Sequence, residues 1–358
     1  MPDGRGLVRL AQLRGEIALL ARGGRFDVVA SMLGELARTD VALGLPADGI
    51  LRARQAAVLA EERGEPVAGP LVTLAATLLA ADAPSEALDA AAVATTKAAE
   101  LSGHARARLE AMARLVGGAA QRRMGRLTEA RVLLDAARGA AARVGAAAVA
   151  GLALAELGHV DLAEGRPDGA AACFEFAAEF LRRAKQEKPA LEADVLCVAA
   201  CAALGDPDAA IERAGRTADE ARRLKRPELV AYLDGVLADL ALAKAPDAAG
   251  EACALAAESA QALPQSPIAR ELACAARLRQ VRATRDPIDR ARHLEAGIDL
   301  AYALEPARAS ARLGAALADL LAEPAPARGE LERLAAAIAR VGDADLSEIA
   351  AAALAEVA

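Results

Sequence analysis

Apolar residues recur at three- and four-residue spacing between short segments that resemble turns. In the stretch 148–163, for example, the apolar positions follow this spacing, and Glu156 and Asp161 form the polar side. Such spacing places the apolar side chains on one face of a helix. Extended along the chain, the pattern predicts about 18 helices of roughly 14 to 20 residues with short connections.

Two series of prolines reveal a repeat. Proline is well tolerated in the first turn of a helix, where its missing N–H has no partner to lose. The two series run at intervals of about 40 residues, and the second falls midway between members of the first. They therefore mark alternating helix starts and predict a repeated helical hairpin. The first series is Pro167, Pro207, Pro246 and Pro287, and the second is Pro189, Pro227, Pro267 and Pro306.

The N-terminal part is less regular. Turns at 23–26 and 64–66 lie one period apart, but the next turn, at 82–84, follows too early. An extra helix or a break in the repeat is therefore expected within 64–84. Another turn is expected at 324–326. The predicted organisation is irregular hairpins in 1–66, a repeat array in 67–343 and a capping helix in 344–358.

The composition favours closely packed helices. Alanine accounts for 102 of the 358 residues, while aromatic residues make up only 2%. Alanine has the highest helix propensity and allows helix axes to approach closely, whereas strands favour β-branched and aromatic residues. The hydrophobic fraction of 55% excludes a disordered chain. The net charge of −7 gives no general reason to expect binding to nucleic acid or an anionic membrane.

The chain start and the cysteines indicate a cytoplasmic protein. Residues 1–5 do not resemble a secretory leader, and no apolar stretch has the roughly 20 residues that a membrane span requires. The five cysteines are odd in number and lie in apolar helical stretches, which favours reduced, buried thiols. No membrane insertion is expected.

Small residues at fixed spacing identify a family resemblance. One unit contains Leu157, Gly158, Gly165, Ala170, Phe174 and Ala177, and the preceding unit contains Gly118, Gly125, Ala130 and Ala137. These positions resemble the tetratricopeptide repeat (TPR), although the period is about 40 residues instead of 34 and the large aromatics of the first helix are missing. The resemblance implies an all-α fold, a right-handed α-solenoid of antiparallel helical hairpins. A divergent solenoid of another helical-pair family is the alternative.

No motif indicates catalysis or a cofactor. The chain contains no glycine-rich phosphate loop, no nucleophile elbow and no HExxH zinc helix. Cys197 and Cys201 share a helix face, but a metal would need two more ligands, for instance Cys173 from a neighbouring helix, so core thiols are the favoured interpretation. Phe174 matches a packing position, so a core role is also favoured for the cluster of Phe174, Phe176 and Phe180. We therefore expect no enzyme, no cofactor and no metal site.

The leading hypothesis is a protein-interaction scaffold or adaptor. The resemblance implies a concave groove, formed by the first helix of each hairpin, that binds a partner peptide or helix. The wall is expected to be mostly small and apolar, which favours a hydrophobic or helical ligand over an acidic one. Self-association is an open variant. The implied groove residues are Met112, Leu115, Arg122, His159, Leu162, Val195, Ala199 and Asp234. For His159, a surface or packing role is the favoured alternative.

A basic stretch gives a second candidate surface. Arg277, Arg279, Arg282 and Arg285 lie near the turn at 286–287, with only Asp286 and Asp289 to offset the arginines around it. Such a patch can hold an acidic peptide or a phosphate by forked contacts, although a solvated face is the favoured interpretation. Aromatic residues that would stack bases are missing, which argues against RNA or single-stranded DNA. The alternative function is a ligand- or peptide-sensing regulatory module of a bacterial signalling system.

Overall fold

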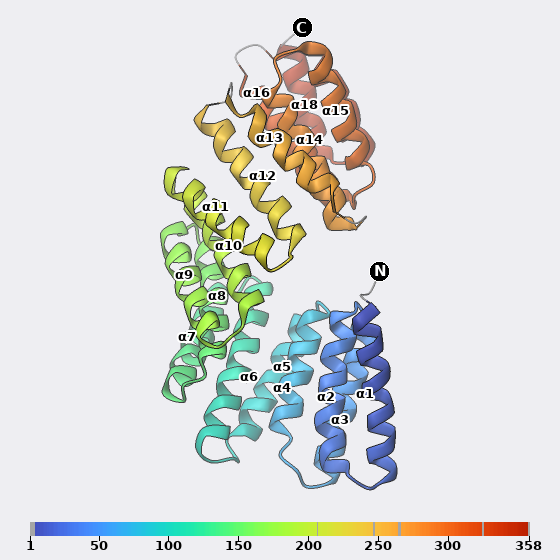
Figure 1. Cartoon of the computed structure of the whole chain (residues 1–358), viewed down its shortest axis with the longest axis vertical. Helices are drawn as coiled ribbons and strands as arrows, with labels where there is room; N and C mark the ends of the chain where they lie inside the picture. The colour runs from blue at the N-terminus through green and yellow to red at the C-terminus, as the bar shows by residue number, and fades with distance from the viewer. Residues whose placement is uncertain (1–3, 206, 246–247, 264–265, 324–325, 357–358) are drawn as a thin grey trace. The chain divides into compact units, whose positions relative to one another are not determined.

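The computed structural model describes residues 4–205, 207–245, 248–263, 266–323 and 326–356. Within these ranges the chain forms eighteen α-helices and no strand, as Figure 1 shows. The predicted all-α class and the predicted number of helices are therefore confirmed. The chain divides into two compact units, Met1–Ala200 and Cys201–Ala358, and the division falls in the last turn of helix α10.

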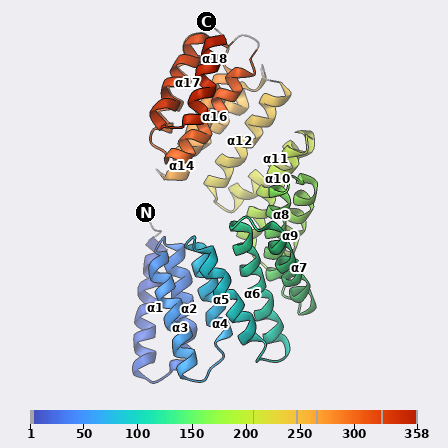
Figure 2. The ribbon, with the colours of Figure 1, turned by 180° about the vertical axis from the view of Figure 1, so that it is seen from behind.

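The first unit is a series of antiparallel helices in which each helix packs on the next, from α1 to α9. The blue and green ribbons of Figures 1 and 2 follow this series from opposite sides. Its helices are α1 (Gly4–Arg22), α2 (Phe26–Ala42), α3 (Pro46–Glu62), α4 (Ala68–Ala80), α5 (Pro84–Ala98), α6 (Gly103–Arg123), α7 (Leu127–Arg143), α8 (Ala147–Ala163), α9 (Pro167–Arg183) and α10 (Glu187–Ala203).

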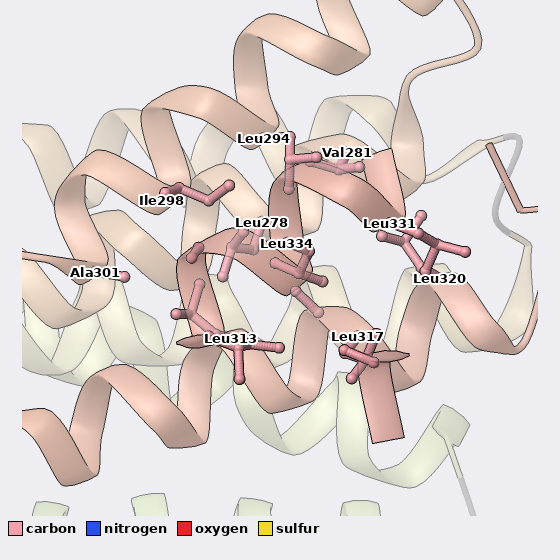
Figure 3. Packing of buried hydrophobic residues seen from close by; sticks show 14 of the residues in the cluster. Leu278, Val281, Leu294, Ile298, Ala301, Leu313, Leu317, Leu320, Leu331 and Leu334 are labelled. Carbon is pink, nitrogen blue, oxygen red and sulfur yellow. The ribbon is translucent and has the colours of Figure 1, made fainter. Parts of the chain in front are cut away.

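The second unit repeats this arrangement. Its largest apolar cluster joins α14 to α18, and Figure 3 shows the leucines of this cluster facing one another. Leu313, Leu331 and Leu334 within it are fully buried. The helices are α11 (Pro207–Arg223), α12 (Pro227–Lys244), α13 (Gly250–Gln261), α14 (Pro267–Ala283), α15 (Pro287–Ala301), α16 (Pro306–Leu321), α17 (Arg328–Val341) and α18 (Ala344–Glu356).

Both proline series mark helix starts, as predicted. Three described members of the first series open α9, α11 and α15, and three of the second open α12, α14 and α16. Pro189 lies in the first turn of α10. The predicted turn at Pro246 and the first two residues of the predicted turn at 324–326 lie outside the described residues.

Between α1 and α12 the described turns use a left-handed residue, usually glycine. Gly125, Gly165 and Gly205 have φ between 72° and 77°, a conformation that glycine adopts without steric cost. Asp82 takes the same conformation at φ 58°. The turn at 82–84 is therefore the ordinary turn between two helices of a hairpin, because such turns recur at about half the repeat period, as at Gly44 and Gly64. The structure corrects the expected extra helix, since α4 is the one helix between the turns at 64 and 82.

Glycines in alternate helices allow close packing within each hairpin. A Cβ atom on Gly118 would lie 2.6 Å from the side chain of Leu134, and one on Gly158 would lie 2.7 Å from the ring of Phe174. Each glycine therefore leaves room for a large side chain from the following helix. The two pairs occupy equivalent places in successive hairpins, α6–α7 and α8–α9.

Candidate functional site

In each unit the even-numbered helices lie next to one another and form a continuous surface, which we call the even-helix face. In the first unit α2 packs on α4, α4 on α6 and α6 on α8. In the second unit α12 packs on α14, α14 on α16 and α16 on α18. The odd-numbered helices α3, α5 and α7 each pack against the even-numbered helices before and after them, so they lie on the other side of the even-helix face in the first unit.

Ion pairs cross this face between neighbouring even-numbered helices. In the first unit Arg122 on α6 contacts Glu156 on α8, with a nitrogen–oxygen distance of 2.7 Å. In the second unit the Nε and Nη2 atoms of Arg279 on α14 donate to both oxygens of Asp239 on α12, at 2.6 and 2.8 Å. Three further cross-helix pairs join α14 and α16: Arg282–Asp319, Arg308–Glu271 and Arg312–Glu271. Most of the charge on these parts of the face is therefore balanced internally.

The first unit contains a hollow between α2, α4 and α6. Its volume is about 510 Å³, within the range of known ligand sites. Small residues occupy much of its wall, among them Gly34 and Gly69. Leu109 and Met112 supply an apolar edge from α6, and Thr73 supplies a hydroxyl from α4.

Two arginines of this hollow lack a carboxylate partner. Arg38 on α2 and Arg108 on α6 are both exposed and line the hollow. Among the described residues, neither has a carboxylate within 4 Å, in contrast to Arg122 and Arg279 on the same kind of face. Glu65 is the one acidic residue of the lining. The charged groups of the hollow therefore carry a net positive charge.

The structure distributes the predicted groove residues unevenly. Met112 lines the hollow. Five others are half-buried residues of even-numbered helices in the first unit: Leu115, Arg122, His159, Leu162 and Ala199.

Two predicted groove residues are corrected. Val195 and Asp234 are buried, with exposed fractions of 7% and 1%. Asp234 accepts hydrogen bonds from Arg222 at 3.3 Å and from the hydroxyl of Ser259 at 2.5 Å. A partner on the surface cannot reach either side chain. Asp234 instead holds α11, α12 and α13 together.

His159 is a packing residue at the edge of the even-helix face. Its ring meets Phe174 edge-on, with centroids 5.3 Å apart and an interplanar angle of 76°. Burial, together with the charge of Arg122, lowers the pKa of His159 below its ordinary value. The imidazole is therefore neutral at pH 7, which suits its contact with the buried Phe174.

The basic stretch in the second unit has more acidic partners than the sequence indicated. The expectation that only Asp286 and Asp289 offset its charge is wrong, because Arg279 pairs with Asp239 and Arg282 pairs with Asp319 from neighbouring helices. Arg277 donates to Gln280 at 2.9 Å, and Arg285, which is exposed, also has an interaction. These pairs cannot be recognised in the sequence, because their members are far apart along the chain and meet only when the hairpins stack.

The described residues do not form a metal or membrane-spanning site. No group of three or more His, Cys, Asp or Glu side chains among them is placed to hold a metal ion. None of the described helices combines the length and apolar character needed to cross a bilayer. All five cysteines are free thiols, and burial raises the pKa of both Cys173 and Cys274 to about 11.

Comparison with known proteins identifies the fold and no sequence family. No family model and no curated protein sequence matches the chain. A similar solved structure is the signal-transduction ATPase (STAND) with a tetratricopeptide repeat sensor from Pyrococcus horikoshii, with a TM-score of 0.62 and 12% identity. The match covers 76% of this chain and 42% of that protein. The chain therefore spans less than half of the STAND protein's length.

Two further structures extend the likeness. The apo form of RapI has a TM-score of 0.56 at 11% identity, and the match covers 97% of each chain. A chain of the APC/C hetero-tetramer Cut9–Hcn1 has a TM-score of 0.51 at 16% identity, covering 75% of this chain and 46% of that one. At these identities the likeness establishes the fold alone. The chain is an all-α solenoid of helical hairpins with the tetratricopeptide-repeat-like fold.

Proposed function

We propose that this chain is a non-catalytic scaffold that binds a partner protein through its even-helix face. The single observation that carries the proposal is the hollow of about 510 Å³ between α2, α4 and α6. Stacked hairpins present extended surfaces of this kind to chain segments of other proteins. The hollow combines small residues, which let a peptide backbone approach, with an apolar edge and two arginines that have no carboxylate partner among the described residues. This combination can contact both the backbone and the side chains of a peptide.

Other parts of the face are less suited to a partner. In the second unit three arginines of the even-numbered helices are already bound to carboxylates: Arg279 to Asp239, Arg282 to Asp319 and Arg312 to Glu271. A partner that used them would have to displace these carboxylates. For Arg38 and Arg108 in the hollow of the first unit, the described residues include no such internal competitor, so we place the principal contact there.

The test compares two single substitutions of exposed residues. Ser31 lines the hollow, so Ser31→Trp fills it, whereas Val132→Trp adds the same bulk on the odd-numbered helix α7, where residue 132 is 65% exposed. Each variant is used as bait in a native lysate, and captured proteins are quantified by mass spectrometry. We expect a partner that wild type and Val132→Trp both capture and Ser31→Trp loses. Equal capture by all three chains would contradict the proposal.

A second candidate function is a ligand-sensing module of a signalling protein. It is favoured by the likeness to the STAND protein, whose repeats are described as a sensor, and by the volume of the hollow, which suits a small molecule. A thermal-shift screen of small metabolites distinguishes the two functions. A metabolite that raises the melting temperature of wild type but not of Ser31→Trp would favour the sensor, and no such compound is expected for the scaffold.

A further inference from the structure

We infer that the hollow between α2, α4 and α6 binds an extended acidic segment of a partner protein, whose carboxylates pair with Arg38 and Arg108. The inference rests on the proposed function and specifies the chemistry of its ligand. It departs from the apolar or helical ligand that the sequence favours, because the sequence indicates neither the hollow nor the unpaired state of its arginines.

The arginines of the even-helix face differ in whether they have a carboxylate partner. Where α6 meets α8, and where α12, α14 and α16 meet, arginines of the even-helix face pair with a carboxylate from the neighbouring even-numbered helix. Arg38 and Arg108 have the same kind of position, but the described residues supply no such carboxylate. A bound acidic segment would provide the missing partners, and guanidinium groups form forked contacts with carboxylates.

The two arginines lie on helices that are not adjacent. They come from α2 and α6, which are separated by α4, and adjacent helices pack about 8–10 Å apart. The helix axes are therefore roughly 16–20 Å apart, so a ligand that contacts both arginines has to extend across α4. An extended chain advances about 3.3–3.6 Å per residue, so two carboxylates within about six residues of one segment span this distance.

The rest of the hollow's lining has room for a peptide backbone and offers an apolar edge. Gly69 has no atom within 4 Å of the place where a Cβ would be, so the backbone of a bound segment has room to approach α4. Leu109 and Met112 form an apolar edge beside Arg108. Glu65 would repel a carboxylate placed against it, but can accept a hydrogen bond from a backbone N–H. The expected segment is therefore acidic at both ends, with an apolar residue near the acidic residue that pairs with Arg108.

The experiment selects peptides without presupposing their sequence. A random library of 12-residue displayed peptides is panned against the purified full chain, against Arg38→Gln/Arg108→Gln and against Arg138→Gln/Arg143→Gln. The last pair removes the same charge from α7, an odd-numbered helix of the same unit. Enriched peptides are then synthesised with a fluorescent label, and their dissociation constants are measured by anisotropy.

Wild type and the α7 control should enrich peptides with two or more Asp or Glu residues and bind them with similar affinity. Arg38→Gln and Arg108→Gln should each weaken binding about threefold or more, the double variant further, and added salt should weaken wild-type binding. Enrichment without acidic residues, equal weakening by the α7 control, or no enrichment at all would overturn the inference. If the double variant still captures a lysate partner that Ser31→Trp loses, the inference fails while the proposed function stands.

Discussion

The ring of Phe174 on α9 occupies the space that a side chain at Gly158 on α8 would need. A Cβ atom at residue 158 would lie 2.7 Å from the Phe174 ring, and Phe174 is fully buried. Leu134 has the same relation to Gly118 one hairpin earlier. In two successive hairpins, the packing of the two helices therefore requires glycine at the equivalent position, and substitution of that glycine tests the requirement.

Gly158→Ala should destabilise the chain. The added methyl group cannot be accommodated unless the Phe174 ring or the helix axis moves, and overpacking of this kind costs about 1–3 kcal/mol. The control is Gly215→Ala on α11, where no atom lies within 4 Å of the new Cβ. There alanine should raise stability by about 0.5–1 kcal/mol through its helix propensity. Urea unfolding followed by circular dichroism gives both values, and equal effects of the two substitutions would contradict this account.

Arg290→Ala should destabilise the second unit far more than Arg292→Ala. Arg290 bonds through Nε to the buried carboxylate of Glu330, at 2.8 and 2.9 Å, and its loss leaves that charge without its Arg290 partner. Loss of one partner of a buried pair costs about 3–5 kcal/mol. Arg292 pairs with Asp289 on the surface, so its loss should change stability by less than about 0.5 kcal/mol. Similar unfolding midpoints for the two variants would show that the α15–α17 pair is not a structural contact.

Asp40→Asn should become increasingly stabilising, relative to wild type, as the pH rises. Both carboxyl oxygens of Asp40 are buried without a hydrogen-bond partner among the described residues, and burial raises the pKa of this carboxyl. The folded state then binds the proton more tightly than the unfolded state does. The stability of wild type therefore falls as the pH rises from about 4, the ordinary value, through the raised pKa. Asparagine does not titrate, so the variant does not lose stability in this way as the pH rises.

The measurement is the difference in free energy of unfolding between Asp40→Asn and wild type, taken from pH 4 to pH 8. Asp89→Asn is the matched control, because Asp89 is exposed on α5. The Asp40 difference should increase with pH, and by more than the Asp89 difference. A flat Asp40 difference would mean that this carboxyl finds a partner in solution.

Cys274 should resist alkylation in the folded chain. It is fully buried, and its pKa of about 11 leaves almost no thiolate at pH 8, the form that reacts with iodoacetamide. Mass spectrometry after timed exposure should find Cys274 unmodified in buffer and modified in denaturant, with the half-buried Cys201 reacting first. Equal rates for Cys274 in buffer and in denaturant would show that α14 opens readily.

The sequence predicts the helices well because proline and glycine restrict the backbone locally. Pro207 and Pro287 indicate helix starts without any knowledge of packing, and Gly125 and Gly165 indicate turns. The hairpin pair of Gly158 and Phe174 also follows, because the family resemblance fixes both positions.

The charged contacts could not be predicted in the same way. Asp161 pairs with Arg131, 30 residues away, and Asp234 with Arg222, 12 residues away, so each pair depends on how helices stack. The sequence therefore places Asp234 in the groove, where the structure buries it. For the same reason, Arg38 and Arg108 have no distinguishing signal in the sequence, since only the folded chain shows which arginines lack a carboxylate.

Site-specific photocrosslinking tests the central claim, that a partner binds in the hollow of the first unit, most directly. A benzoylphenylalanine is placed at residue 31 in one chain and at residue 132 in another, and both are irradiated in the native lysate. We predict that the crosslinker at position 31, on α2, captures one partner. The crosslinker at position 132, on α7, should give no crosslinked product of the same mass. Crosslinking of the same partner from position 132 alone would contradict the claim and place the binding surface on the odd-numbered helices.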